Sequence, residues 1–289
     1  MSQLLMLGNT TVLLLFLLLI WGNLVAGLKV GLACPDWPLC HGKILPPFRW
    51  DIYMEFAHRI IGAVTSVFLI ALCYKRFRIY SGTSKVVPII TIVLLLLQIL
   101  LGGIVVLLRL PVDLTTVHFG VAIIIFSLTF YLAFFDGTDK KPVLSITSKS
   151  CLFLLLAILI ISQAVLGAFV RHSGAGLACP DFPKCLGFWI PPNLTGIVLT
   201  HFLHRVIAYL VFVCALILYT SSYASARLRD IRSNLMLILA LTLVQVIVGV
   251  AVVHSKLLFL ITAFHITLAL LILSTVLYTF FKDMRESQA

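Results

Sequence analysis

The chain has 289 residues, of which 62% are hydrophobic and only 11% are charged, and its formal net charge is +11. A soluble globular domain is about half apolar and about a quarter charged, so this composition excludes that class and indicates an integral membrane protein. The positive charge alone would suit a nucleic-acid-binding protein, but the placement of the basic residues gives it another explanation, and we expect no nucleic-acid partner.

Apolar runs of about 20 residues, the length that spans a bilayer as a helix, follow one another along the chain. Lipid offers the backbone no hydrogen-bond partners, so each run is expected to be helical. No Lys or Arg precedes the first run, and we expect it to be kept as a helix rather than removed as a signal peptide. The eight expected helices cover residues 9–27, 52–74, 86–108, 113–135, 150–170, 196–219, 232–253 and 257–281.

The basic residues are distributed unequally between the two sides of the membrane if the helices alternate in direction. Twelve Lys and Arg fall on the side of the termini and seven on the other side. Cytoplasmic loops carry this excess of positive charge, so we expect a multi-pass protein of a bacterial plasma membrane with both termini in the cytoplasm. The long loops 28–51 and 171–195 then lie outside, where disulfides persist.

The second half of the chain repeats the first. Ordered matches at offsets of 145 to 147 residues relate the halves, and each half holds four expected helices. An even number of helices makes the halves run in the same direction, related by an axis along the membrane normal. We predict an all-α fold of two tandem four-helix bundles with pseudo-two-fold symmetry, residues 1–137 and 138–289. The matched segments are LACPDWPLC (32–40) with LACPDFPKC (177–185), EFAHRIIG (55–62) with HFLHRVIA (201–208), and QILLG (98–102) with QVIVG (245–249).

Two histidines in each half lie at one depth, about 8–14 Å below the outer helix ends at ~1.5 Å per residue. They are His58 and His118 in the first half and His204 and His265 in the second. Opposed imidazoles in a bundle suit a haem, whose iron takes one ligand on each face. The alternatives are polar packing between helices, and zinc, which usually takes three or four ligands. We favour haem ligation, because ionisable side chains at membrane depth are costly and usually functional.

The repeat breaks at one position beside these histidines. Glu55 in the first half corresponds to His201 in the second, and each precedes the proposed ligand by three residues. The two sites are therefore expected to do different jobs, with the carboxylate acting as a base or stabilising a developing cation. Its alternative is a salt bridge, for which we expect Arg59 to be a poor partner. Arg59 and Arg205 either bind haem propionates or extend to the outer interface.

Other polar residues near the outer side have structural explanations. We expect His41, His172 and His254 to be solvated. Amides paired with glycines are expected to aid close helix packing rather than to contact a cofactor. These pairs are Gln98 with Gly102, Gln163 with Gly167, Gln245 with Gly249 and, in a relaxed form, Asn23 with Gly27.

Taken together, EFAHR (55–59), HFLHR (201–205), His118, His265 and the cysteine pairs resemble the heme A synthase family over nearly the whole chain. The resemblance implies an enzyme that oxidises a methyl group of haem O to a formyl group, giving haem A for cytochrome oxidase.

The resemblance also implies roles for single residues. His204 and His265 would ligate a resident haem b, and His58 and His118 would hold the iron of the substrate, haem O. Glu55 would stabilise a carbocation-like intermediate or position water. The family has homo-oligomeric members and is thought to cooperate with haem O synthase, so we expect a homo-oligomer, haem O synthase and a membrane electron acceptor as partners.

The cysteine pairs, Cys34 with Cys40 and Cys179 with Cys185, each enclose two prolines that favour a tight loop. We expect each pair to close a disulfide-linked cap over its bundle, with Trp37 or Phe182 covering the haem edge or entering the interface. A structural clip is favoured over a thiol pair that passes electrons or holds substrate.

Two other functions fit the same residues. A dihaem b-type cytochrome that relays electrons from quinol also needs two pairs of imidazoles, and a haem carrier without turnover also binds haem. The exchange of Glu55 for His201 favours the enzyme, because an electron relay has no need of a carboxylate at only one site.

Overall fold

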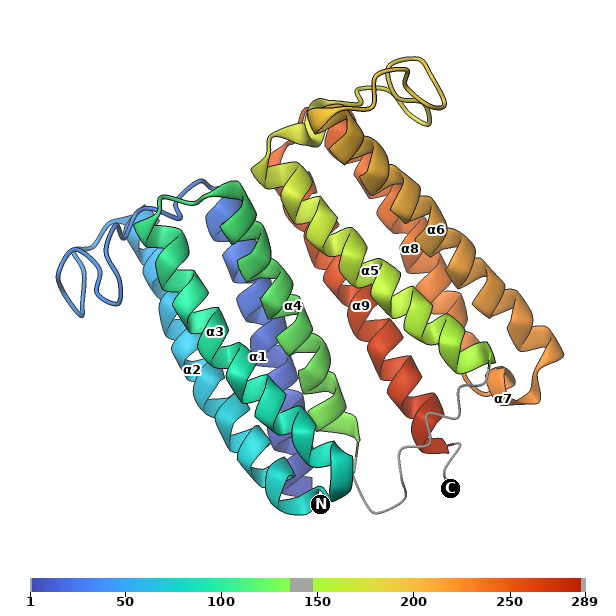
Figure 1. Ribbon diagram of the computed structural model, residues 1–289, viewed down its shortest axis with the longest axis horizontal. Helices are drawn as coiled ribbons and strands as arrows, with labels where there is room; N and C mark the ends of the chain where they lie inside the picture. The colour runs from blue at the N-terminus through green and yellow to red at the C-terminus, as the bar shows by residue number, and fades with distance from the viewer. Residues whose placement is uncertain (1, 136–147, 287–289) are drawn as a thin grey trace. The chain divides into compact units, whose positions relative to one another are not determined.

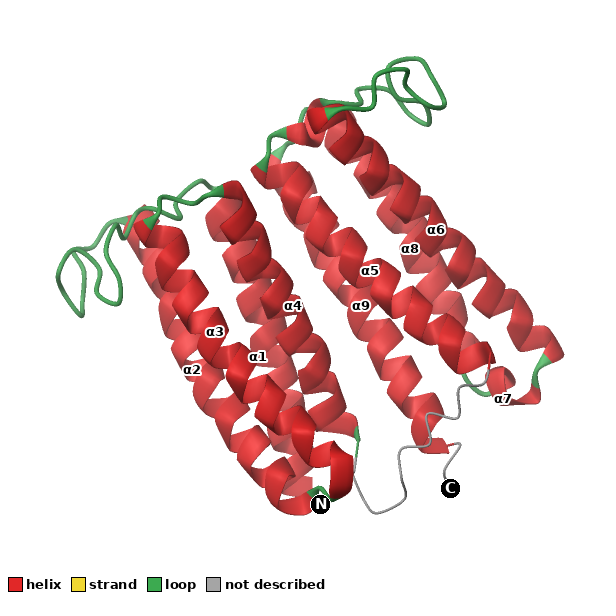
Figure 2. Ribbon diagram, viewed as in Figure 1, coloured by secondary structure: helices red, strands yellow, loops and turns green. Residues whose placement is uncertain are grey.

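The structure is a computed structural model that describes residues 2–135 and 148–286, and the regular elements of this part are helices (Figures 1 and 2). Within it, eight helices are long and apolar enough to cross a membrane, as predicted. Several begin or end beyond their expected limits, as α1 does by starting at Ser2 rather than at residue 9.

The described residues form two compact units, one before and one after residues 136–147. The boundary expected between residues 137 and 138 lies outside the described residues. The limits of the domains and the symmetry that relates them therefore stay predictions, and each unit is described by itself.

In the first unit, four long helices form a closed ring (Figure 1). Helix α1 packs on α2 and α4, and α3 packs on the same two helices, so α2 and α4 lie diagonally across the bundle. The elements are α1 (Ser2–Gly27), α2 (Trp50–Ile79), the short 3-10 helix η1 (Gly82–Lys85), α3 (Val86–Leu107) and α4 (Val112–Phe134).

The second unit has the same order of neighbours. Helix α5 packs on α6 and α9, and α8 also packs on these two, so α6 and α9 are diagonal. The elements are α5 (Ser148–His172), the 3-10 helix η2 (Ala175–Leu177), α6 (Gly196–Ala224), α7 (Ala226–Arg229), α8 (Arg232–His254) and α9 (Phe259–Glu286).

The short connections between α3 and α4 and between α8 and α9 are closed by left-handed backbone. Arg109 and Leu110 have φ of 60° and 61°, and Lys256 and Leu257 have φ of 54° and 66°. In the first turn, Leu110 N–H donates to the carbonyl of Val105 at 2.8 Å, which satisfies one of the last carbonyls of α3. These tight turns start α4 and α9 immediately, which brings their histidines to within two turns of the outer end.

Many of the fully buried apolar side chains of the first unit lie in the half of the bundle away from the cysteine loop, and a smaller buried cluster of Cys34, Cys40 and Ile52 lies at the loop. Those away from the loop include Leu69 and Leu72 on α2 and Ile123, Phe126 and Leu132 on α4. Since lipid is as apolar as these side chains, close packing rather than removal from water holds the helices together here. The half of the bundle nearer the loop contains the polar residues of the candidate site.

Candidate functional site

Each of the four predicted histidines packs against a glycine of the neighbouring helix. A Cβ atom placed on Gly22 of α1 would lie 2.9 Å from Cε1 of His58 on α2, which is closer than real Cβ atoms approach other atoms. The missing side chain therefore makes room for the imidazole. The other pairs are His118 with Gly102 at 3.2 Å, His204 with Gly167 at 3.0 Å and His265 with Gly249 at 3.1 Å.

The expected pairing of Asn23 with Gly27 in α1 stays a prediction. Asn23 donates from Nδ2 to the carbonyl of Leu19 at 2.8 Å, within its own helix. Gly22 faces His58, and Gly22 lies 145 residues before Gly167, the offset already given by the cysteines. The offset of 145 residues therefore relates Gly22 to Gly167. The spacing of an amide four residues before a glycine does not identify Gly22, because Leu18 stands at that position.

Three glutamines contact three of the histidines directly. Each places its amide nitrogen 3.3 Å from Nε2 of an imidazole, so the amide orients the ring rather than only joining helices. At the corresponding position of α1 the chain has Leu18, whose side chain offers no amide to His58. The pairs are Gln98 with His118, Gln163 with His204 and Gln245 with His265.

The paired imidazoles fit a haem iron. His58 and His118 stand on the diagonal helices α2 and α4, and His204 and His265 stand on the diagonal helices α6 and α9. The Nδ1 atoms of all four are buried without a hydrogen-bond partner among the described residues. A buried ring nitrogen without a partner is costly unless a ligand uses the ring.

Both predicted disulfides are present. Cys34 is bonded to Cys40 and Cys179 to Cys185. In the first loop Trp37 lies over α3, because a Cβ on Gly103 would be 2.7 Å from its ring. Gly103 follows the glycine that faces His118, so the loop covers the end of the bundle at the level of the histidines.

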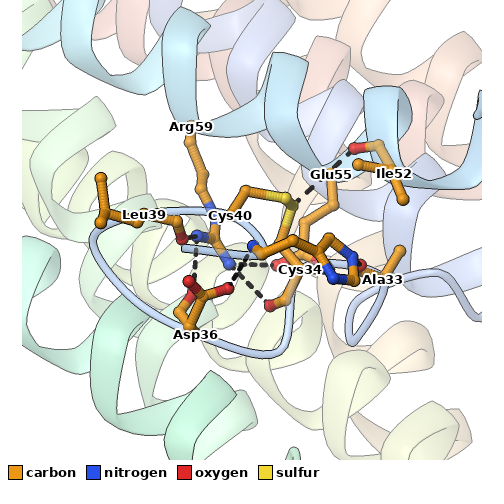
Figure 3. A network of polar contacts seen from close by, with 9 residues as sticks. Ala33, Cys34, Asp36, Leu39, Cys40, Ile52, Glu55 and Arg59 are labelled. Carbon is orange, nitrogen blue, oxygen red and sulfur yellow. Dashed lines mark hydrogen bonds and ion pairs between the residues drawn. A yellow bond between two sulfur atoms is a disulfide. The ribbon is translucent and has the colours of Figure 1, made fainter. Parts of the chain in front are cut away.

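Glu55 is the buried acid of the first unit, with a relative exposure of 3% (Figure 3). Cys34 N–H donates to Oε2 at 2.9 Å, and Arg59 Nη2 donates to Oε1 at 2.7 Å. The expectation that Arg59 would be a poor partner is wrong, because residues 55 and 59 are four apart and lie on one helix face.

Both arginines that follow the ligands bind the cysteine loops. Arg59 donates from Nη1 to the carbonyls of Asp36 at 2.8 Å and Leu39 at 2.6 Å, and from Nη2 to the carbonyl of Cys34 at 2.9 Å (Figure 3). One planar guanidinium thus joins the loop to the acid. Arg205 makes the equivalent bonds to the carbonyls of Asp181, Lys184 and Cys179.

His201 takes the place of Glu55 in the second unit and is equally buried, with a relative exposure of 5%. Its Nδ1 lies 3.0 Å from the carbonyl of Ala175 and 3.4 Å from the amide nitrogen of Cys179. Arg205 therefore bonds to loop carbonyls without the carboxylate that Arg59 has. In both units an arginine holds the cysteine loop, and the units differ in whether a carboxylate or an imidazole lies beside that arginine.

Each cysteine loop is closed at its tip by an aspartate. Asp36 accepts from the backbone N–H groups of His41 at 2.6 Å and Gly42 at 2.7 Å, and Asp181 accepts from the equivalent residues of the second loop. The N–H groups of Gly42 and His41 hold the pKa of Asp36 below its ordinary value. The pKa of Asp181 is lowered in the same way, by Gly187 and Leu186.

The fold and the site define a multi-pass membrane protein whose units each carry two glycine-backed imidazoles beneath a disulfide loop. The chain belongs to the COX15-CtaA family of cytochrome oxidase assembly proteins, whose sequence profile matches residues 48–277. It is 31% identical over 265 residues to "Heme A synthase" from Bacillus licheniformis, covering 87% of this chain and 86% of that protein. It is 31% identical over 283 residues to "Heme A synthase" from Halalkalibacterium halodurans, covering 94% of each.

Proposed function

We propose that this chain is a heme A synthase, an oxidoreductase of the plasma membrane that oxidises a methyl group of haem O to a formyl group. Membership of the cytochrome oxidase assembly family and the name shared by both relatives support this activity over a dihaem electron relay. Haem A, the product, then supplies cytochrome oxidase.

We assign the two pairs of imidazoles to different haems. His58 and His118 of the first unit hold the iron of haem O, the substrate. His204 and His265 of the second unit hold a resident haem b, which supplies one-electron chemistry when bound. The buried Nδ1 atoms and the glycines behind the rings support haem ligation by both pairs.

The observation that carries the proposal is the carboxylate found in only one unit. Glu55 lies one turn from His58, and its carboxylate is held in one orientation by Cys34 N–H and Arg59. A fixed negative charge stabilises positive charge that develops at the substrate carbon, and it also accepts a proton from a water that approaches that carbon. A relay or a carrier gives no reason for this difference between the units.

The loop arrangement supports the proposed orientation. Disulfides persist in an oxidising compartment, and the two disulfides therefore support an arrangement with the cysteine loops outside and both termini in the cytoplasm. Haem O then reaches the outer half of the bundle, where haem O synthase, a membrane electron acceptor and further copies of this chain are the proposed partners.

Pigment extraction tests the activity directly. The chain is produced in cells that make haem O but no haem A, and haems are separated by chromatography. The proposal predicts haem A with the intact chain, and haem O without haem A when Glu55→Gln is produced. Bound haem without any haem A from the intact chain would support the relay or the carrier instead.

A further inference from the structure

One peptide group of the first cysteine loop links an exposed histidine to the buried carboxylate. Nε2 of His41 lies 2.8 Å from the carbonyl oxygen of Ala33, and Cys34 N–H donates to Oε2 of Glu55 at 2.9 Å. The Ala33 carbonyl and the Cys34 N–H belong to the same peptide bond. A carbonyl oxygen only accepts, so His41 Nε2 carries the proton and donates. The hydrogen bonds therefore run without a break from the His41 ring to Glu55.

The backbone at His41 is held for this contact. His41 has a φ of 54°, in the left-handed region that residues other than glycine seldom occupy. Its N–H donates to Oδ1 of Asp36 at 2.6 Å, and Gly42 N–H donates to Oδ2 at 2.7 Å. The two bonds to one carboxylate fix the turn from which the ring reaches back to Ala33.

The hydrogen bond from His41 to the Ala33 carbonyl affects the N–H at the other end of the same peptide group, that of Cys34. A hydrogen bond accepted by the carbonyl oxygen polarises the peptide and strengthens the bond donated by its N–H. It also holds the peptide plane, so the Cys34 N–H stays directed at Glu55. His41 thus influences both the strength and the direction of a bond to the acid without touching it.

The second loop repeats the turn but lacks this link. Leu186 stands at the position of His41, with a φ of 57° and its N–H donating to Asp181, and its side chain offers no hydrogen bond. In the same unit, His201 replaces the acid. The histidine on the loop and the carboxylate in the bundle therefore occur together in one unit and are both missing from the other.

We propose that His41 is a positioning residue for Glu55, which it orients through the Ala33–Cys34 peptide. The ring, the peptide and the acid form one unit that presents the carboxylate to the substrate. This assignment replaces the expectation that His41 is merely solvated, and it rests on the proposed catalytic role of Glu55.

The test uses the haem-loaded, full-length protein with two substitutions of this exposed residue. His41→Leu installs the residue of the second loop and removes the donor. His41→Gln keeps an N–H donor at a similar reach. Leu186→Gln places the same amide on the second loop as a matched control. The readouts are the infrared carboxylate band of Glu55, identified as the band that Glu55→Gln removes, and the rate of haem A formation.

We expect His41→Leu to shift the Glu55 band and to slow haem A formation about tenfold, the effect of one lost hydrogen bond. His41→Gln and Leu186→Gln should retain both the band and the rate. An unshifted band in His41→Leu overturns the proposal, as does equal impairment in His41→Gln, provided mass spectrometry shows the Cys34–Cys40 disulfide intact. The band reports on the link even if the intact chain makes no haem A, which separates failure of this proposal from failure of the proposed activity.

Discussion

Arg59 and Glu55 form an ion pair in which Nη2 lies 2.7 Å from Oε1, and the same guanidinium holds three carbonyls of the disulfide loop. The acid is therefore fixed by the loop above it as well as by its own helix. In the second unit Arg205 holds the loop in the same way, but His201 stands where the acid would be. Both units therefore share the bonds between the arginine and the loop, and only the first unit places an acid, Glu55, at this position.

Replacement of Arg59 by Lys should uncouple the loop from the acid. A lysine ammonium is compact and cannot reproduce the planar fork that bonds the carboxylate and three carbonyls together. We expect haem binding to persist while haem A formation falls by on the order of tenfold to a hundredfold. Product formation measured by chromatography gives the rate, and amide hydrogen exchange of residues 33–40 gives the loop mobility.

The matched control is Arg205→Lys, which loosens the second loop and leaves Glu55 in place. Its exchange should rise in residues 178–185 only, and haem A formation should change far less than in Arg59→Lys. Equal loss of activity in both variants would show that the arginines matter for folding and not for the acid.

A methyl group on the glycine behind a proposed haem ligand should displace the imidazole. In Gly167→Ala the new Cβ lies 3.0 Å from Cε1 of His204, so the ring must shift. Overpacking of this kind costs about 1–3 kcal/mol, and we expect haem retention in the second unit to weaken about tenfold or more. The measurement is the Soret absorbance per protein after dilution with apomyoglobin as a haem acceptor.

Gly62→Ala is the control for this prediction. Its Cβ would lie 3.9 Å from a methyl of Leu18, an ordinary contact, so absorbance should match that of the unsubstituted protein. If Gly167→Ala held haem as tightly as Gly62→Ala, His204 would not need the room that the glycine provides.

The two disulfides should differ in their effect on turnover. Cys34 supplies both an N–H to Glu55 and a carbonyl to Arg59, whereas Cys179 faces His201 and Arg205. Joint replacement of Cys34 and Cys40 by Ser should therefore reduce haem A formation about tenfold. The same change at Cys179 and Cys185 should reduce haem A formation less. A larger loss of haem A formation in the Cys179 and Cys185 variant than in the Cys34 and Cys40 variant would contradict the catalytic role of Glu55 in the first unit.

Acid should open the tips of both loops. The pKa values of Asp36 and Asp181 are lowered in the folded chain by backbone N–H groups. Their stabilising contribution is therefore present above the ordinary aspartate pKa of about 3.9, and it is lost as the pH falls through the lowered folded values. We expect reduction of the Cys34–Cys40 disulfide by a phosphine to accelerate below about pH 4. In Asp36→Asn the reduction should be fast at every pH, and a flat profile in the intact chain would contradict this explanation.

Much of the fold and half of the site could be predicted from the sequence. Apolar runs determine the helices because lipid forces the backbone to bond with itself, and the repeat located the four histidines at one depth. The disulfides followed from cysteine spacing and loop orientation. These features depend on periodicity and length, which a single sequence displays directly.

The missed features depend on contacts between side chains and loop backbone. The bonds of Arg59 to loop carbonyls and the reach of His41 to Ala33 have no pattern of spacing, because any residue supplies a carbonyl. The Glu55–Arg59 pair had such a pattern, a separation of four residues, and was misjudged. The amides of Gln98 and its equivalents were recognised as paired with glycine, but their contact with an imidazole required the neighbouring helix.

The haem content of purified variants tests most directly the claim that the two units hold different haems for different purposes. The chain and its His204→Ala variant are purified from cells that make haem O, and the bound haems are extracted and identified. We predict that the intact chain holds haem B together with haem O or haem A, and that His204→Ala loses haem B while still binding haem O in the first unit. Retention of haem B in His204→Ala, together with loss of haem O, would contradict the account.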